Sequence, residues 1–446
     1  MKRRHLLQLG SMATLSMFLP WRSQAETGKY AGPYVIALHA AGGWDTTLFC
    51  DAHKASDKIQ QNLYGDPVTQ GALKIAPLEL KRNGTTLDTV PNFFNDLGKR
   101  FLVVNGIDTQ TNNHDTGVKH IWSGKTFEEL PGIAALLAAG VAETQLLPVS
   151  YISSGGYDVT ADLVPLTRIS GGGNNLLRVA RPHLTNPDDD PMDWRPYFTD
   201  ATFDRLTAAR NARLEQLAGA SQTPRMAKAI ETYRLARDGA SGFAALADVL
   251  PAKLVTVADA FPNLGGYNDD ELERYLQAAQ MALCAFKSGQ AAAASLATFG
   301  FDTHAFHDLD QPAVLGRLLL TIRYLFSLAD SMGLANNLYI VVGSDFGRTP
   351  TYNDQNGKDH WNVTSMLFAG PGIPGGTVIG GTDDEMRPLS VAKGNPKQLL
   401  GYNDPMGTRI FPAHVQRALR KKIGISAALD ERFHLNVESP LDDMLT

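Results

Sequence analysis

The chain has 446 residues, of which 43% are hydrophobic and 20% charged, so it is long enough to bury a large core and too apolar to be disordered. With 41 basic and 46 acidic residues the formal net charge is −5, and no basic patch stands out, which argues against a nucleic-acid partner. The two cysteines, Cys50 and Cys284, are too few for a disulfide scaffold or a cysteine zinc finger. We expect them to be unpaired because Cys284 lies on an apolar helical face, although an oxidising compartment would allow a bridge.

The first 25 residues have the pattern of an export signal. Met1–Arg4 is basic, Leu6–Leu19 is moderately apolar, and a small-x-small cleavage pattern ends at Ala25. The paired Arg3 and Arg4 indicate a twin-arginine signal, with an ordinary secretory signal as the alternative. The apolar stretch is shorter than the roughly 20 residues of a membrane span, and no later stretch is long enough. We therefore expect cleavage after Ala25 and a periplasmic or secreted protein with no transmembrane anchor.

Short apolar runs that end in loops indicate buried parallel strands along the rest of the chain. These runs lie at residues 33–39, 101–106, 148–153 (the weakest), 295–300, 338–343 and 364–369. Helical patterns between and after them occur at 316–332 and 412–423. The range from about 186 to 290 is helical in pattern with almost no strand signal, and we interpret it as an insertion. The alternation predicts a three-layer α/β sandwich around a mostly parallel sheet over residues 26–446.

Aspartate and histidine side chains follow these strands repeatedly. The candidates at strand ends, or in the loop before the last strand, are Asp45, His114, Asp302, His304, His307, Asp345 and His360. Any single Asp in such a place also fits a helix cap or a turn, and His39, within the first strand, fits a hydrogen-bonded core residue. Because the carboxyl ends of parallel strands meet at one edge, gathered carboxylates would repel unless a cation bridged them. The set predicts a divalent metal, either zinc-like or a harder ion such as manganese, magnesium or calcium.

Several of these segments resemble the motifs of a bacterial exported family known as domain of unknown function 1501. The matching segments are Gly42–Asp45, Leu102–Gly106, Asn113–His114, Ile121–Gly124, Asp302–His304, Gly343–Pro350 and Gly357–Trp361. The resemblance covers nearly the whole mature chain and is weakest through the helical insertion. That family is related to the alkaline phosphatase and sulfatase superfamily. The resemblance therefore implies an α/β sandwich with a metal-assisted hydrolytic site at the strand ends.

The resemblance also implies roles for individual residues. The metal ligands that it implies are Asp45, Asp302, Asp345 and His360, together with His304 or His307. Phe346 stands where a phosphatase carries a metal-binding histidine, which leaves one metal or none. At the position of the superfamily's nucleophile this chain has Asn residues, which cannot act as nucleophiles. Either Thr116 or Thr46 is the nucleophile, or a water held by the metal attacks directly, or the protein catalyses no reaction.

Two further residues are catalytic candidates. His114 is a metal ligand, a general acid for the leaving group, or a loop residue paired with a carboxylate. Arg348 fits a clamp on an anionic oxygen or a support for its own loop. The sequence thus favours an exported metal-dependent hydrolase of phosphate or sulfate esters, acting on an anionic small molecule or a carbohydrate ester, with a metal-dependent sugar-ester hydrolase as a variant. The alternative is a catalytically inactive exported protein that keeps the fold and docks a partner protein or polymer.

Overall fold

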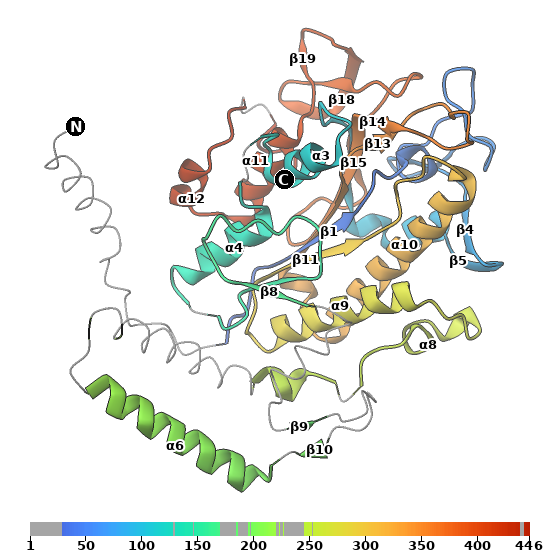
Figure 1. The fold of residues 1–446 in the computed structure, drawn as a ribbon. Helices are drawn as coiled ribbons and strands as arrows, with labels where there is room; N and C mark the ends of the chain where they lie inside the picture. Colours follow the sequence, from blue (N-terminus) through green and yellow to red (C-terminus); the bar gives the residue numbers. More distant parts are fainter. Residues whose placement is uncertain are drawn as a thin grey trace, which may run out of the picture.

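The central sheet is built from strands that are buried on both faces. The computed structural model describes residues 29–127, 130–145, 147–169, 184–185, 195–196, 198–219, 223, 226, 245–251, 253–437 and 441–446, so the expected export signal lies outside the described residues. The sheet has eight strands in the order β16-β6-β15-β12-β1-β11-β7-β8 (Figure 1). Their bounds are β1 (Tyr34–Ala40), β6 (Leu102–Asp108), β7 (Tyr151–Ser153), β8 (Leu166–Arg168), β11 (Ala293–Thr298), β12 (Leu338–Ser344), β15 (Val363–Ala369) and β16 (Thr377–Gly380). Every residue of β1, β6, β11, β12 and β15 is buried, which explains why they read as unbroken apolar runs.

One strand of this sheet runs against the others. β15 pairs antiparallel with both β12 and β6, whereas the other strand pairs of the sheet are parallel. The beginning of β15 therefore lies at the edge where the other strands end. Residues that precede β15, such as His360, consequently join residues that follow β1, β11 and β12.

Helices cover both faces of the sheet (Figure 1). The first layer consists of α2 (Val90–Leu97), α9 (Asp270–Lys287) and α10 (His307–Ser331), and the second of α3 (His114–Ser123), α4 (Ile133–Ala142) and α11 (Pro412–Ile423). Side chains of β1 alternate between the two cores, with Ile36 and Leu38 in the first and Val35 and Ala37 in the second. The predicted three-layer α/β sandwich is confirmed.

Apart from the elements at residues 184–260, the remaining described elements lie outside the main sheet and these helices. They are η1 (Thr46–Leu48), β2 (Val68–Gln70), β3 (Leu73–Ile75), β4 (Glu79–Arg82), β5 (Thr85–Thr89), η2 (Gly98–Arg100), η4 (Pro262–Leu264), η5 (Ala335–Asn337), β13 (Gly347–Arg348), β14 (His360–Trp361), β17 (Leu389–Ala392), β18 (Asn395–Tyr402), β19 (Gly407–Thr408) and α12 (Ala427–Arg432). β17, β18 and β19 form a separate three-stranded sheet that the sequence pattern did not predict, because β18 is largely exposed and lacks an apolar face.

The range 186–290 holds several elements of different kinds. Its described parts include β10 (Arg195–Pro196), which pairs with β9 (Leu184–Thr185), and the helices α6 (Asp200–Gly219) and α8 (Val257–Ala260). The last helix of the range, α9, packs against α10 and β11 and belongs to the sandwich. Its buried stripe includes Leu276, Leu283 and Phe286. A helix of the core has the same spacing of apolar residues as a helix of an insertion, so the sequence pattern did not distinguish the two.

Helix α10 begins earlier than the sequence pattern predicts. It starts at His307 rather than Gly316 and passes through Pro312, whose missing N–H is a helix-breaking signal that tertiary packing overrides here. Among the described helices it is the one that is long and apolar enough to cross a membrane by composition, and 78% of its apolar window is buried inside the protein. Helix α11 occupies the predicted residues. Cys50 and Cys284 are free and buried, as expected.

Candidate metal centre

The loop after β1 is fixed to the end of β12 by hydrogen bonds. The Ser344 hydroxyl oxygen accepts the N–H groups of Gly43 and Trp44 at 3.1 and 3.0 Å, and donates to the Ala40 carbonyl at 2.6 Å. Gly42 has a φ of +120°, and a side chain there would place its Cβ 2.5 Å from the backbone nitrogen of Asp302. Glycine at this position therefore allows the first loop to pass directly beside Asp302.

Asp345 is a buried acceptor for three N–H groups. Its carboxylate accepts from His114 Nδ1 at 2.6 Å, from His39 Nε2 at 3.2 Å and from the Gly42 amide at 3.1 Å. Burial alone would raise the pKa of Asp345, but these partners outweigh it and hold the pKa well below its usual range. Asp345 is thus ionised, and its carboxylate holds the His114 and His39 rings in place.

The tautomer of His39 follows from its partners. Its Nδ1 accepts the indole N–H of Trp122 at 2.9 Å, so its Nε2 carries the proton that it gives to Asp345. His39 is 4% exposed. This agrees with its interpretation as a hydrogen-bonded core residue, while its contact with Asp345 also makes it part of the support for His114.

Three histidines turn the same ring atom toward Asp302. The Nδ1 of His114 donates to Asp345, that of His304 to Asp359 at 2.7 Å, and that of His360 to the Asn112 carbonyl at 2.7 Å. Each Nε2 then faces the Asp302 carboxylate, at 3.4 Å for His114 and 3.1 Å for both His304 and His360. An oxygen acceptor on the far ring nitrogen is the arrangement that orients imidazoles for metal binding.

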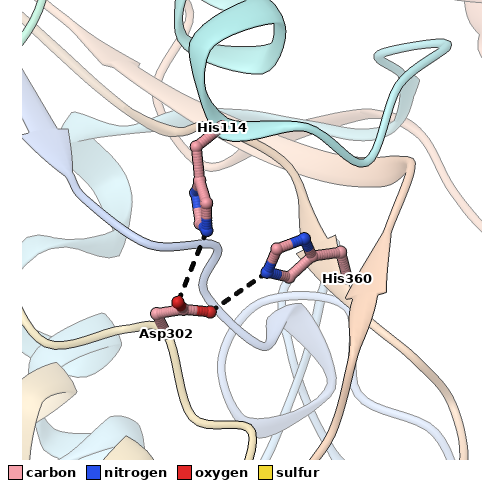
Figure 2. A group of neighbouring side chains, drawn as sticks. All are labelled: His114, Asp302 and His360. Atoms are coloured by element: carbon pink, nitrogen blue, oxygen red, sulfur yellow. Dashed lines mark hydrogen bonds and ion pairs between the residues drawn. The ribbon is translucent and has the colours of Figure 1, made fainter.

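The spacing of these donor atoms fits a divalent cation. Ligand atoms of His114, Asp302 and His360 all lie within 4.8 Å of one another, and their side chains converge in Figure 2. His304 Nε2 lies 2.9 Å from His360 Nε2. A tetrahedral ion with bonds of about 2.0 Å separates its ligand atoms by about 3.3 Å, close to these distances. A proton on one of the two Nε2 atoms makes this contact a hydrogen bond, and a shared cation is the alternative when both rings are neutral.

Arg348 anchors the loops rather than reaching outward. It is 2% exposed, and its guanidinium donates to the carbonyls of Gly43 at 2.8 Å, Lys358 at 2.9 Å and Gly42. Its remaining bond, at 2.6 Å, goes to Asp302 Oδ1. Burial would raise the pKa of Asp302, yet Arg348 and His360 lower it below its usual value. The geometry therefore gives Arg348 the loop-supporting role that was the alternative to a substrate clamp.

Asp45 and His307 form a second, fully buried cluster with Lys358. Asp45 Oδ2 accepts from His307 Nε2 at 3.0 Å and from the Lys358 ammonium at 2.8 Å, and Oδ1 accepts from the Thr47 amide and hydroxyl. His307 Nδ1 is bonded to the Thr303 hydroxyl at 2.7 Å. A lysine thus supplies the positive charge that we expected a metal to supply to Asp45 and His307.

The predicted ligand set therefore divides into three groups. Asp302, His304 and His360 meet at one point with His114, whereas Asp345 contacts that point through His114. Asp45 and His307 lie in the lysine cluster. Of the nucleophile candidates, Thr46 is buried, and the Thr116 amide donates to Asn113 Oδ1 at 3.2 Å; within the described chain no hydrogen bond links the Thr116 side chain to Asp302.

Phe346 closes one side of the candidate centre. It is fully buried, and its ring lies 4.8 Å from the His114 ring and 4.4 Å from the His360 ring, measured between centroids. The apolar ring supports both imidazoles and offers no donor atom for a second ion. The structure thus places one cluster of facing metal donors, rather than two, among the residues that it describes.

Sequence reasoning missed Lys358 and the Asn112 carbonyl. Lysine is rarely buried, so Lys358 gave no signal of its own, although it stands two residues before His360. A backbone carbonyl such as that of Asn112 leaves no trace in the residue types. A buried lysine would have been detectable only from the need to neutralise Asp45.

Substituting alanine for Gly42 should destabilise the protein by more than about 2 kcal/mol, because a left-handed φ and a clash with the Asp302 backbone add together. The matched control is Gly394→Ala, where φ is +78° and nothing lies within 4 Å of the added Cβ, and there we expect a loss of about 1 kcal/mol. Urea unfolding measures both. Equal losses would contradict the close approach of the two loops.

Replacing Asp345 with Asn should weaken metal binding about 10- to 100-fold. Three N–H groups point at this carboxylate, and an amide offers one oxygen and a competing NH₂, so His114 loses the acceptor that fixes its tautomer. Competition with a chelating dye measures the affinity. Asp310→Asn, an exposed change of equal charge on α10, should leave it unchanged. Equal affinities in the two variants would contradict the role given to Asp345.

These observations define a three-layer α/β protein with a candidate metal centre at the carboxyl edge of its sheet. The chain belongs to the family of proteins of unknown function designated DUF1501, whose model matches residues 33–399. The expectation from the sequence motifs is thereby confirmed. No curated protein sequence matches the chain.

Similar solved structures include members of the alkaline phosphatase superfamily. The lipoteichoic acid synthase LtaP from Listeria monocytogenes is 9% identical with a TM-score of 0.37, and the match covers 92% of this chain and 76% of that one. A protein of the alkaline phosphatase superfamily from Vibrio parahaemolyticus is 8% identical, with a TM-score of 0.34 and coverage of 90% and 70%. Alkaline phosphatase from the Antarctic bacterium TAB5 is 9% identical, with a TM-score of 0.31 and coverage of 77% and 92%. Similarities this low say nothing about activity.

Proposed function

We propose that this protein is an exported hydrolase with a single divalent metal that acts on phosphate or sulfate esters. The observation that carries the proposal is the convergence of the Nε2 atoms of His114 and His360 on the Asp302 carboxylate, with the Nδ1 of each ring held by an oxygen acceptor. Two imidazoles and one carboxylate favour zinc or manganese over magnesium or calcium. A bound cation of this kind would neutralise charge on the transferring group and acidify water.

The protein's own residues have distinct tasks in this proposal. Asp302, His114 and His360 hold the cation, and Asp345 keeps the proton of His114 on Nδ1, away from the cation. Arg348 fixes the loop of Gly42 and Gly43 and one oxygen of Asp302. His304 is 45% exposed in its side chain and is positioned by Asp359, so it is the imidazole that can bind the cation as a fourth ligand or exchange a proton with the leaving group.

The test is turnover of aryl phosphate and aryl sulfate esters by the mature, metal-loaded protein. We expect hydrolysis that disappears with a chelator, returns with zinc or manganese, and falls by at least about 100-fold in His360→Ala. Asp310→Ala, an exposed change on α10, should retain full activity. Hydrolysis that persists in His360→Ala or in the presence of the chelator would contradict the proposal.

A binding protein that keeps the fold is the second candidate. It is favoured by Phe346, which lies against the His114 and His360 rings and offers no donor atom for a second cation, and by the loop position where Asn113 precedes His114 without a serine. A protein that binds one metal tightly, hydrolyses no phosphate or sulfate ester and captures an exported partner would support this candidate instead. In that case the chain and its exported partner would work together as a two-protein system.

A further inference from the structure

A separate cavity of about 490 Å³ lies beyond the far end of α3. Its walls come from the loop after β6, from α3, from β19 and from the start of α11, elements that lie together in Figure 1. Gln110 of the loop after β6 lines this cavity, while Asn112 of the same loop and His114, the first residue of α3, serve the candidate metal centre. The cavity is therefore distinct from the metal centre but shares one loop with it. Its volume suits a single sugar-sized ligand.

The cavity carries an excess of positive charge. Lys393 and Arg409 line it, and no aspartate or glutamate is among the described residues that do. Arg409 is partly compensated, because its guanidinium donates to Asp108 Oδ2 at 2.9 Å. Lys393 is exposed and forms no ion pair within the described part of the chain. At the start of α11, Pro412 has no N–H, and the N–H groups of Phe411 and His414 are bonded within the turn, so the Ala413 N–H is the one that the described residues leave for a ligand.

His120 supplies a buried hydrogen-bond acceptor to the same cavity. It is 4% exposed, and its Nδ1 donates to the Thr109 carbonyl at 2.8 Å. Burial lowers its pKa, so the ring is neutral near pH 7 and its Nε2 carries a lone pair. Nε2 has no hydrogen-bond partner among the described residues. A neutral acceptor calls for a donor on the ligand, which sulfate lacks.

We propose that this cavity binds a hydroxylated organic anion of monosaccharide size, such as a sugar acid. The anionic group would face Lys393 and the start of α11, and a hydroxyl group would donate to His120 Nε2. The Phe411 ring, stacked on the His414 ring with centroids 5.6 Å apart, gives the cavity one apolar wall for the face of a sugar ring. The proposal does not depend on hydrolysis at the metal centre.

Isothermal titration of the metal-free, full mature chain with glucuronate tests this proposal. We expect glucuronate to bind saturably with a dissociation constant below about 10 mM. Glucose has the hydroxyl groups without the charge, and sulfate has the charge without a hydroxyl donor, so each should bind at least about tenfold more weakly. Lys393→Glu should weaken glucuronate binding at least about tenfold. The matched control Lys397→Glu, an exposed change on β18 outside the cavity, should have no such effect.

A second variant isolates the imidazole. His120→Asn keeps a donor for the Thr109 carbonyl and removes only the Nε2 acceptor, so the fold should survive while glucuronate binding weakens about tenfold. Circular dichroism and the unfolding midpoint confirm folding. The proposal is overturned if glucuronate does not bind below about 10 mM, if sulfate binds equally well, if Lys393→Glu or His120→Asn binds like the wild type, or if Asp302→Ala removes the binding.

Discussion

The metal-stripped protein is expected to bind one equivalent of zinc or manganese, and Asp302→Ala is expected to weaken that binding by at least about 100-fold. Asp302 is the residue that His114, His304 and His360 all face, so its loss removes the one negatively charged ligand at the centre. It also leaves the buried Arg348 without its carboxylate partner. Elemental analysis of the protein purified in its native form and calorimetric titration of the apoprotein measure the stoichiometry and the affinity.

Controls separate a metal centre from adventitious binding. Asp310→Ala removes an exposed carboxylate from the first turn of α10 and should leave one equivalent bound at unchanged affinity. Asp45→Asn/Lys358→Met removes a carboxylate whose oxygens are occupied by Lys358, His307 and Thr47 without leaving a buried charge unpaired, and should leave the number of bound ions at one. Two equivalents in the wild type, one of them lost in this double variant, would show that Asp45 is a ligand after all.

Replacing Lys358 with Met is expected to lower the free energy of unfolding by about 3–5 kcal/mol. Lys358 and Asp45 are almost completely buried and 2.8 Å apart, so removing the ammonium leaves an uncompensated buried carboxylate. The double variant Asp45→Asn/Lys358→Met should recover part of the loss, because it no longer buries that charge. Lys421→Met, which breaks an exposed pair with Asp443, should cost less than about 1 kcal/mol.

The same pair predicts how stability changes with pH. Burial alone would raise the pKa of Asp45, but Lys358 and His307 outweigh it and hold the pKa far below its usual value. A carboxyl group with a depressed pKa stabilises the folded state fully above its unfolded pKa of about 3.9, and the contribution declines as the pH falls below that value. Urea unfolding between pH 6 and about pH 3 should therefore lose stability more steeply in the wild type than in Asp45→Asn/Lys358→Met. Parallel curves would contradict the ionised state of Asp45.

The sequence predicted the sheet well because its strands are buried on both faces. Runs such as those around Val35 and Val103 leave no polar face, so their place in a parallel sheet followed from composition alone. The direction of β15 was not predictable in this way, since a buried strand reads the same in either direction. The position of His360 at the carboxyl edge depends on that direction, and the motif resemblance supplied the expectation that the pattern alone could not.

The assignment of individual ligands depended on local turns that the residue types do not reveal. His304 and His307 stand three residues apart and were equal candidates for pairing with Asp302. Phe306 adopts a left-handed conformation with φ of +51°, which turns the chain between them. His304 remains exposed beside Asp302, whereas His307 begins α10 and is buried against Asp45. A turn of this kind is set by tertiary packing, because Phe has no local preference for it.

The opposite direction of β15 has a consequence for how the family can diversify. Since β12 ends and β15 begins at the same edge as neighbours in the sheet, the excursion between them, residues 345–362, leaves and rejoins the scaffold at one place. That single excursion carries Asp345, Arg348, Lys358 and His360. It thus supplies one of the three proposed cation ligands, His360, and the residues that hold the other two, since Asp345 bonds His114 and Arg348 bonds Asp302. Exchanging residues 345–362 between relatives would alter the chemistry at the carboxyl edge of the sheet without changing the register of its strands.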